Sequence, residues 1–140
     1  MGKSGLKVSP LCLGTMLFGR ETPSQESQLI IESARSSGIN FIDTADAYVG
    51  GDSERLVGRC IKTSRDHWVL ATKLANKMGQ GPNKGGLSRK WVMQACEESL
   101  RRLRTDYIDI YYLHKEDHAT PLRETIMAIG DLIKDGKIRY

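Results

Sequence analysis

Four residues that can carry protons stand at the ends of short apolar stretches or just beyond them. Asp43 ends the run FID, Lys73 ends VLATK, and His114 ends YIDIYYLH. Tyr48 lies five residues beyond Asp43, in a loop of small residues. Apolar runs of this length, bounded by polar loops, are typical of buried strands. The sequence therefore predicts polar side chains where several strands end.

The spacing of these residues predicts that they share one edge of a parallel sheet. Lys73 follows Asp43 by 30 residues, and His114 follows Lys73 by 41, so each interval can hold one β-α unit. Neighbouring parallel strands place their carboxyl ends side by side. A carboxylate and an ammonium that leave water together there must pair. Tyr48 can reach the same place from the loop that follows Asp43.

A tyrosine beside an ammonium can serve as a proton donor. The pKa of a phenol is ~10 in water, and a nearby positive charge stabilises the phenolate and lowers that pKa. Lys73 is the candidate for this charge, and Asp43 would keep Lys73 charged and in position. His114 could donate a hydrogen bond to a substrate oxygen. The set predicts proton delivery to a carbonyl oxygen that gains negative charge, as reduction by hydride requires.

Strand-like and helix-like patterns alternate along the chain. The expected strands are Leu11–Met16, Ile39–Asp43, His67–Lys73 and Ile108–His114, with the start of a fifth over 137–140. This alternation predicts parallel strands, either in an open doubly wound sheet or in a (β/α)8 barrel. The barrel is favoured, because no glycine fingerprint follows the first strand and the reactive residues come from several strand ends.

Chain length limits how much of a barrel is present. A whole barrel needs about 200 residues or more, and the chain has 140. The expected fold is therefore α/β, the N-terminal half of a parallel (β/α)8 TIM barrel with about four β-α units. Residues 1–140 would form a single partial barrel domain whose C-terminal half is absent. Its open edges predict self-association.

Capping residues mark where the intervening helices are expected to begin. The expected N-caps are Thr22 (with Pro23 as first helical residue), Asp52 and Ser88, and Thr120-Pro121 opens the last helix. The apolar residues expected to face inward on the last helix are Leu122, Ile126, Ile129 and Ile133. The glycine-rich stretch 78–86 lacks the spacing of a phosphate-binding loop, which favours a flexible loop at the rim.

Four motifs in order resemble the aldo-keto reductase family. They are SGLKVSPLCLGTMLFG, FIDTADAYVGGDSE, VLATK and YIDIYYLHKED, and GKIRY resembles the approach to the family's fifth strand. The resemblance covers essentially the whole chain. It implies a (β/α)8 barrel that uses NADPH, or sometimes NADH, without a metal, on a small-molecule carbonyl substrate.

The resemblance also implies roles for individual residues. It places the family's catalytic tetrad on Asp43, Tyr48, Lys73 and His114, with Tyr48 as the proton donor and with Tyr48 and His114 facing the substrate. It places Gly14, Thr15 and Met16, together with Asp43, beside the nicotinamide and its ribose. The second half of the family's barrel, beyond Tyr140, carries the ring that stacks on the nicotinamide and the loops that hold the phosphates.

Two classes of function remain open under this resemblance. The first is an NADP(H)-dependent oxidoreductase that reduces aldehydes or ketones to alcohols. The second is a nucleotide-binding regulatory subunit of the same fold that turns over slowly or not at all, as in the channel-associated members of the family, or an inactive fragment. The complete tetrad favours the enzyme.

Composition disfavours several other classes. With 39% hydrophobic and 27% charged residues the chain has an ordinary globular composition, and its apolar runs are far shorter than the ~18 residues of a membrane span. No apolar stretch follows Met1, so a cytoplasmic protein without membrane contact is expected. Three cysteines that lie far apart favour free thiols.

The net charge of +4 does not by itself indicate a nucleic-acid partner. Most basic residues are spread along the chain, and only Arg101, Arg102 and Arg104 cluster. They end an expected helix, where cations complement the helix dipole, and no aromatic residues lie between them. We therefore expect no nucleic-acid binding.

Two other kinds of site are weaker interpretations. His114 and His118 suggest a metal pair, but Pro121 places them in a strand end and loop, and no third ligand is evident. Asp43 and Asp46 suggest a glycosidase carboxylate pair, but they belong to one loop and Lys73 would keep Asp43 ionised.

Overall fold

Each apolar stretch becomes one strand of a single parallel sheet, and the stretches between them fold back over it as helices. The computed structural model describes residues 1–140. The strands lie in the order β1-β2-β3-β4, and every neighbouring pair is parallel. The strands are β1 (Leu13–Gly14), β2 (Phe41–Asp43), β3 (Val69–Leu74) and β4 (Ile110–Leu113). The helices are α1 (Ser24–Ser36), α2 (Asp52–Cys60), α3 (Arg89–Leu103) and α4 (Leu122–Lys134), with 3-10 turns at Tyr48–Gly51 and Lys62–His67.

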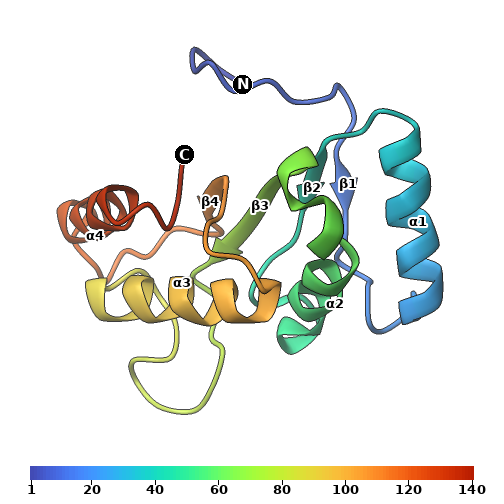
Figure 1. Cartoon of the computed structure of the whole chain (residues 1–140). Helices are drawn as coiled ribbons and strands as arrows, with labels where there is room; N and C mark the ends of the chain where they lie inside the picture. The colour runs from blue at the N-terminus through green and yellow to red at the C-terminus, as the bar shows by residue number, and fades with distance from the viewer.

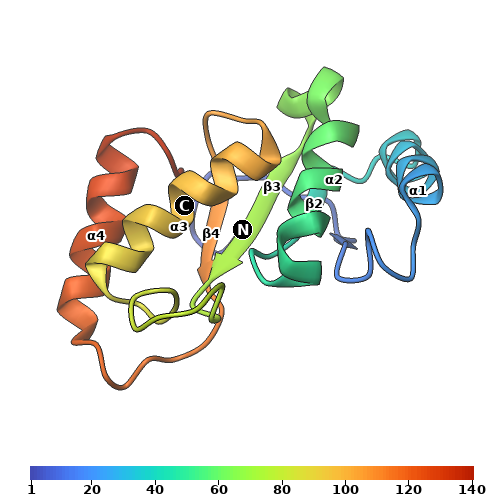
Figure 2. The same cartoon turned by 90° about the horizontal axis from the view of Figure 1, so that it is seen from below.

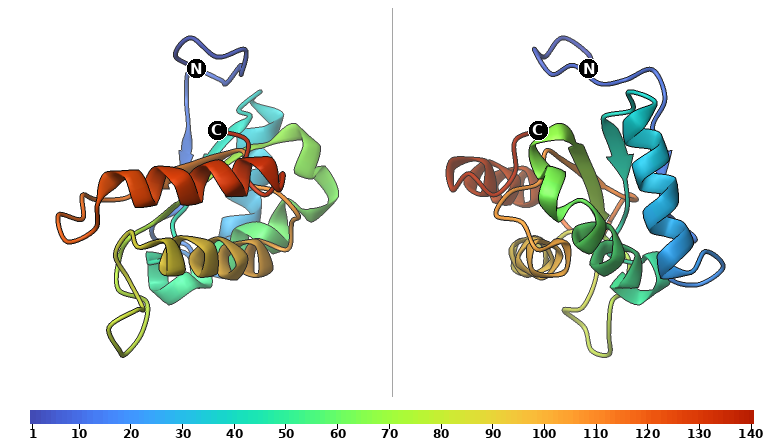
Figure 3. Two further views of the ribbon diagram at one scale, coloured as in Figure 1. Left: turned by 90° about the vertical axis from the view of Figure 1, so that its left-hand side faces the viewer. Right: turned by 45° about the vertical axis from the view of Figure 1, so that its right-hand side comes forward.

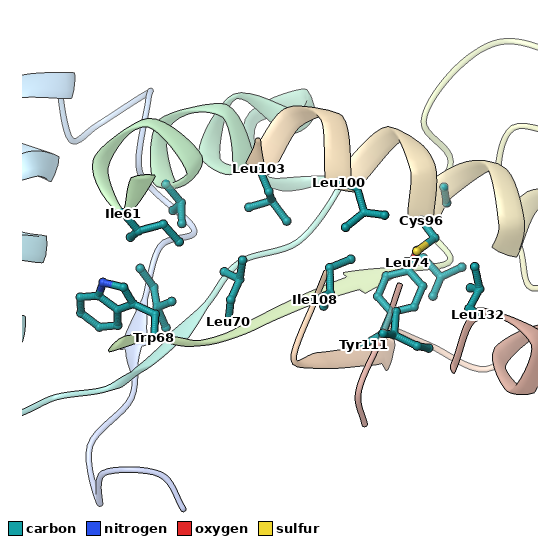
Figure 4. Packing of buried hydrophobic residues seen from close by; sticks show 14 of the residues in the cluster. Ile61, Trp68, Leu70, Leu74, Cys96, Leu100, Leu103, Ile108, Tyr111 and Leu132 are labelled. Atoms are coloured by element: carbon teal, nitrogen blue, oxygen red, sulfur yellow. The ribbon is translucent and has the colours of Figure 1, made fainter. Parts of the chain in front are cut away.

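The helices cover one face of the curved sheet in chain order, with α1 and α4 at the two ends of the row (Figures 1 and 2). The main apolar core lies between this layer and the sheet, and Figure 4 shows Leu70 and Leu74 of β3 facing Cys96, Leu100 and Leu103 of α3. Side chains alternate along a strand, so Val69 and Ala71 form a small cluster on the opposite face. The arrangement confirms the expected N-terminal half of a (β/α)8 barrel with four β-α units.

All four expected strands are present, but each is shorter than expected. β1 contains only Leu13–Gly14, because the chain turns at Thr15, whose carbonyl accepts a hydrogen bond from the Phe18 amide. The expected start of a fifth strand is confirmed as pairing beside β4. Ile138 bridges Ile108 in parallel, and the Tyr140 amide donates to the Asp109 carbonyl at 2.8 Å.

The expected helix starts are confirmed in part. Ser88 caps α3, since its Oγ accepts a hydrogen bond from the Trp91 amide at 3.3 Å. Thr22 and Asp52 are not N-caps: α1 begins after Pro23 without a side-chain cap, and α2 begins after Gly51. Gly51 has a φ of 94°, a conformation that glycine adopts at no steric cost. Asp52 lies in the first turn instead, where a negative charge favours the helix dipole.

The prediction of which residues of the last helix, α4, face the core is wrong. Three of its four residues are exposed, namely Leu122, Ile126 and Ile133, and only Ile129 packs against the core. The buried residues of α4 are Thr125, Ala128 and Leu132. The helix packs along α3 (Figure 3), and this contact fixes its rotation about its own axis. The exposed apolar residues of α4 therefore form a stripe that no other part of these 140 residues covers. This apolar stripe consists of Leu122, Ile126, Met127 and Ile133.

Candidate active site

Lys73 is the centre of the candidate site, and it contacts two of the three residues that the sequence predicted beside it. Its Nζ lies 2.5 Å from Asp43 Oδ2 and 3.0 Å from the Tyr48 hydroxyl. A third hydrogen bond goes to the Thr44 carbonyl at 2.8 Å. The Lys73 and Asp43 side chains are only 14% and 23% exposed. The predicted meeting of these residues at the carboxyl ends of neighbouring strands is therefore confirmed as geometry.

The chain that follows β2 brings Tyr48 over Lys73. The amides of Thr44 and Asp46 donate to the carbonyls of Ala71 and Lys73 on β3, which ties this loop to the strand. Directly after Tyr48, Val49 takes a φ of 49° and the chain reverses through two glycines. The phenol of Tyr48 is consequently held beside the ammonium group of Lys73.

Two hydrogen bonds keep Lys73 charged. Burial lowers the pKa of an ammonium, but the hydrogen bonds to Asp43 and Tyr48 outweigh that effect and raise the pKa of Lys73 above its usual value. An ammonium can only donate hydrogen bonds, so the Tyr48 oxygen is the acceptor. The hydroxyl proton of Tyr48 is therefore free to be donated to another molecule.

His114 lies beside the phenol in an uncharged form. Its ring is 5.9 Å from the Tyr48 ring, edge to face. Burial lowers the pKa of His114, and the nearby charge of Lys73 lowers it further. The neutral ring has one acceptor nitrogen and one donor nitrogen, and the Asn76 side-chain nitrogen lies 3.0 Å from Nδ1. An amide nitrogen only donates, so Nδ1 accepts and Nε2 carries the proton.

Asn76 is the site residue that the sequence did not predict. It comes three residues after Lys73, just past β3, and its sequence position alone carries no signal for a contact with His114. The preceding residue, Ala75, is buried and has a φ of 115°. Such a conformation costs a residue with a side chain about 1–3 kcal/mol and is found at functional sites. It turns the chain at the end of β3 and directs Asn76 toward the next strand.

The three residues predicted beside a cofactor differ in what they can offer. Gly14 is paired in register with Asp43, and Gly14 and Met16 are both exposed. Thr15 is fully buried. Its hydroxyl bonds to the Asp43 carbonyl and to Ser53, and its carbonyl accepts from Ser53. Gly14, Met16 and the partly exposed Asp43 carboxylate are thus open to a ligand, whereas the buried Thr15 holds the turn through its hydrogen bonds.

The side chain of Asp46 takes no part in this site, although its backbone amide is bonded to Lys73. Its carboxylate is fully buried and has no hydrogen-bond partner. Burial raises the pKa of Asp46 to about 7, and the negative charge of Glu54 contributes in the same direction. Asp43, by contrast, is bound to Lys73. The two carboxyl groups therefore lack the shared access to solvent that a pair of glycosidase carboxylates needs.

Fold and site together define a class of protein, a parallel β/α barrel with ionisable side chains at the carboxyl ends of its strands. The chain belongs to the aldo/keto reductase family, whose family model matches residues 10–140. None of the helices combines the length and the apolar character that a membrane crossing requires.

Known relatives include both enzymes and channel-associated proteins. The chain is 39% identical over 144 residues to a probable voltage-gated potassium channel subunit beta of Arabidopsis thaliana, covering 100% of this chain and 44% of that protein. It is 39% identical over 154 residues to norsolorinic acid reductase of Aspergillus flavus, covering 98% and 39%.

A solved structure matches the fold closely. The holo form of aldo-keto reductase AKR11C1 from Bacillus halodurans superposes with a TM-score of 0.90 at 40% identity, covering 99% of this chain and 47% of that one. The chain spans less than half the length of each of these relatives.

Proposed function

We propose that the protein is an NADP(H)-dependent oxidoreductase that reduces aldehydes or ketones to alcohols, with Tyr48 as the proton donor. The observation that carries this proposal is the hydrogen-bonded series from Asp43 through Lys73 to the Tyr48 hydroxyl. NADPH is the favoured cofactor and NADH the alternative. Its nicotinamide end would lie against Gly14, Met16 and Asp43, and the phosphate-holding loops that the family resemblance implies lie beyond Tyr140.

Each member of the tetrad has one step in this proposal. A dinucleotide, when bound, would supply the hydride for the carbonyl carbon. Tyr48 gives its proton to the carbonyl oxygen as negative charge develops there, and the ammonium of Lys73 stabilises the phenolate that remains. Asp43 keeps Lys73 charged and in position.

His114 orients the substrate in this scheme. Its protonated Nε2 can donate to the same carbonyl oxygen, because Asn76 occupies Nδ1. A neutral imidazole polarises the carbonyl without competing with Tyr48 for the role of acid. Tyr48 and His114 are therefore the two proposed contacts to a small-molecule carbonyl substrate.

The test of this proposal is Tyr48→Phe in the full-length protein. Turnover of reactive aldehydes, followed by the absorbance of the reduced nicotinamide, should fall by about 10²- to 10⁴-fold, because the transferred proton is lost. Cofactor affinity, measured by quenching of tryptophan fluorescence, should stay within about twofold. A variant that keeps the wild-type turnover rate would remove Tyr48 from the role of acid.

The channel-associated relatives support a second candidate function. A regulatory subunit of the same fold would bind the nucleotide and oxidise it hardly at all. The identity of 39% to a probable potassium channel beta subunit favours this alternative, and the hydrogen-bonded series of Asp43, Lys73 and Tyr48 favours the enzyme. Single-turnover oxidation of bound NADPH by an aldehyde separates the two, since only the enzyme converts the bound cofactor within seconds.

A further inference from the structure

A strongly basic groove lies between α2 and α3, away from the tetrad. It is a hollow of about 450 Å³ with no hydrophobic residue in its lining. Its lining residues are Arg55, Arg59, Glu98, Arg101, Arg102 and Arg104. Figure 2 shows the two helices side by side on the outer face of the sheet. Five guanidinium groups therefore face a single carboxylate.

Most of this positive charge is not neutralised within the protein. Arg102 is paired with the buried Glu54 at 2.5 Å. Arg55 donates a long hydrogen bond to the Gly51 carbonyl at 3.4 Å, and its nearest carboxylate, on Asp52, is 4.0 Å away. The three others form no hydrogen bond or ion pair and are exposed: Arg59, Arg101 and Arg104. Glu98 cannot balance them alone, because it is shared with Lys84 at 3.9 Å and Arg102 at 3.8 Å.

Helix dipoles do not account for this concentration of arginines. A helix carboxyl end carries about half of one negative charge, so the two helix ends together offset roughly one guanidinium. The three guanidinium groups without partners repel one another and lower the stability of the fold unless something binds them. The sequence shows only Arg101, Arg102 and Arg104 together, and the packing of α2 on α3 adds Arg55 and Arg59.

We propose that this groove is a binding site for a small, multiply phosphorylated ligand. The planar guanidinium group matches phosphate oxygens in a two-point geometry. The volume of the hollow lies within the range of about 300–1,000 Å³ that small-molecule sites occupy. This volume exceeds what one phosphate group fills. A lining without apolar residues selects for a ligand that is charged over most of its surface.

The groove is independent of the tetrad and of the proposed reduction. It is formed by α2 and α3, which follow the neighbouring strands β2 and β3. Both walls of the groove are therefore present in these 140 residues. The ligand could be a free polyphosphate or the phosphorylated headgroup of a lipid, since both present the same chemistry. A nucleic acid would present phosphates along a strand, and the absence of aromatic residues from the lining disfavours it.

The test is titration calorimetry of the full-length protein with inorganic tripolyphosphate at low ionic strength. We expect saturable binding of one ligand that weakens as salt is added. The double variant Arg59→Gln, Arg101→Gln should bind at least about tenfold more weakly, because it loses two charge-assisted contacts. The matched control is Arg35→Gln, Arg123→Gln, which removes two exposed arginines from α1 and α4 and should bind within about twofold of the unchanged protein.

Two further arms identify the source of the phosphates. In these experiments the protein is sedimented with neutral vesicles that contain or lack a phosphoinositide bisphosphate. Binding to vesicles that needs both this lipid and the groove arginines assigns the site to a lipid headgroup. Binding of tripolyphosphate without binding to vesicles assigns it to a free ligand. Absence of saturable tripolyphosphate binding, or equal loss in both double variants, would overturn the proposal. Binding of a single-stranded oligonucleotide through the groove that tripolyphosphate does not displace would also overturn it.

Discussion

At the scale of single residues, the candidate site depends on side chains that hold one another in one protonation state. Lys73 stays an ammonium because Asp43 and Tyr48 accept its hydrogen bonds, and His114 stays neutral because it is partly buried near that ammonium. Asn76 then decides which nitrogen of His114 carries the proton. A positioning residue of this kind is expected to change activity through its neighbour.

Replacement of Asn76 tests this positioning role. In Asn76→Ala the proton of His114 is free to move to Nδ1, so Nε2 loses its proton for part of the time. We expect kcat/KM for an aldehyde to fall about tenfold, which corresponds to one lost hydrogen bond. The ¹⁵N chemical shifts of the His114 ring should show the altered tautomer. Asn83→Ala, in the exposed loop, is the control, and an unchanged tautomer in Asn76→Ala would contradict the role.

Asp46 gives the stability of the fold a dependence on pH with a definite sign. Its pKa is about 7 in the folded chain, against an ordinary value of 3.8. Between about pH 4 and pH 7 the folded state keeps a proton that the unfolded state has released. This residue's contribution to stability therefore falls as the pH rises through that window, and the full penalty is present above it.

Asp46→Asn should remove this dependence. We expect the variant to gain on the order of 2 kcal/mol over wild type at about pH 8 and to gain little near pH 4. Urea unfolding at both pH values measures the difference. The exposed Asp106→Asn serves as the control and should change little at either pH. An equal effect of Asp46→Asn at both pH values would show that the carboxyl group is not the cause.

At the scale of elements, α2 and α3 approach so closely that only glycine fits between them. A Cβ added at Gly58 would overlap the carbonyl of Leu103 at the end of α3. The same contact brings the arginines of the two helices together. Gly130, in α4, has no neighbouring atom within 4 Å of an added Cβ. Substitution of these two helical glycines by alanine is therefore expected to change the stability of the fold in opposite directions.

Gly58→Ala should lower the free energy of unfolding by about 1–3 kcal/mol, because the backbone of α3 must move. Gly130→Ala should raise it by roughly 1 kcal/mol, since alanine favours a helix. Thermal and urea unfolding measure both changes. Equal effects of the two substitutions would show that the close approach at Gly58 is relieved without cost.

At the scale of the whole molecule, residues 1–140 present an apolar stripe on α4 and the free edge of β1. The exposed apolar residues of α4 include Ile126 and Met127, at 55% and 57% exposure. Contiguous apolar surface and free strand edges favour association between chains. Under the proposed function, the cofactor contacts that these residues would provide are those to the nicotinamide end, namely Gly14, Met16 and Asp43.

Residues 1–140 expressed alone should therefore self-associate and should not reduce carbonyls at an appreciable rate. Size-exclusion chromatography with light scattering measures the first, and oxidation of NADPH by an aldehyde measures the second. The double variant Ile126→Lys, Met127→Lys should shift the chain toward monomer. Ser33→Lys, Ser36→Lys adds the same charge to exposed positions of α1 and should leave the association unchanged. A monomer with ordinary enzyme turnover would contradict both expectations.

The sequence by itself determined the order of the β-α units and the meeting of Asp43, Tyr48 and Lys73. Such features follow from the order of the elements, because each apolar run forms one strand and consecutive parallel strands place their last residues side by side. Ser88 could likewise be recognised as a cap, since its bond is made within three residues. The resemblance to the aldo-keto reductases rests on the same short motifs in order.

Only the tertiary structure decided the features that depend on distances between segments remote in the chain. The contact of Asn76 with His114 needs the turn at Ala75 and the neighbouring strand. The rotation of α4 is set by its packing on α3, and the periodicity of its own sequence does not specify it. The arginine groove arises because Gly58 lets α2 approach α3. A sequence pattern shows which face of a helix is apolar, but the partner that covers a face is chosen by packing across the whole molecule.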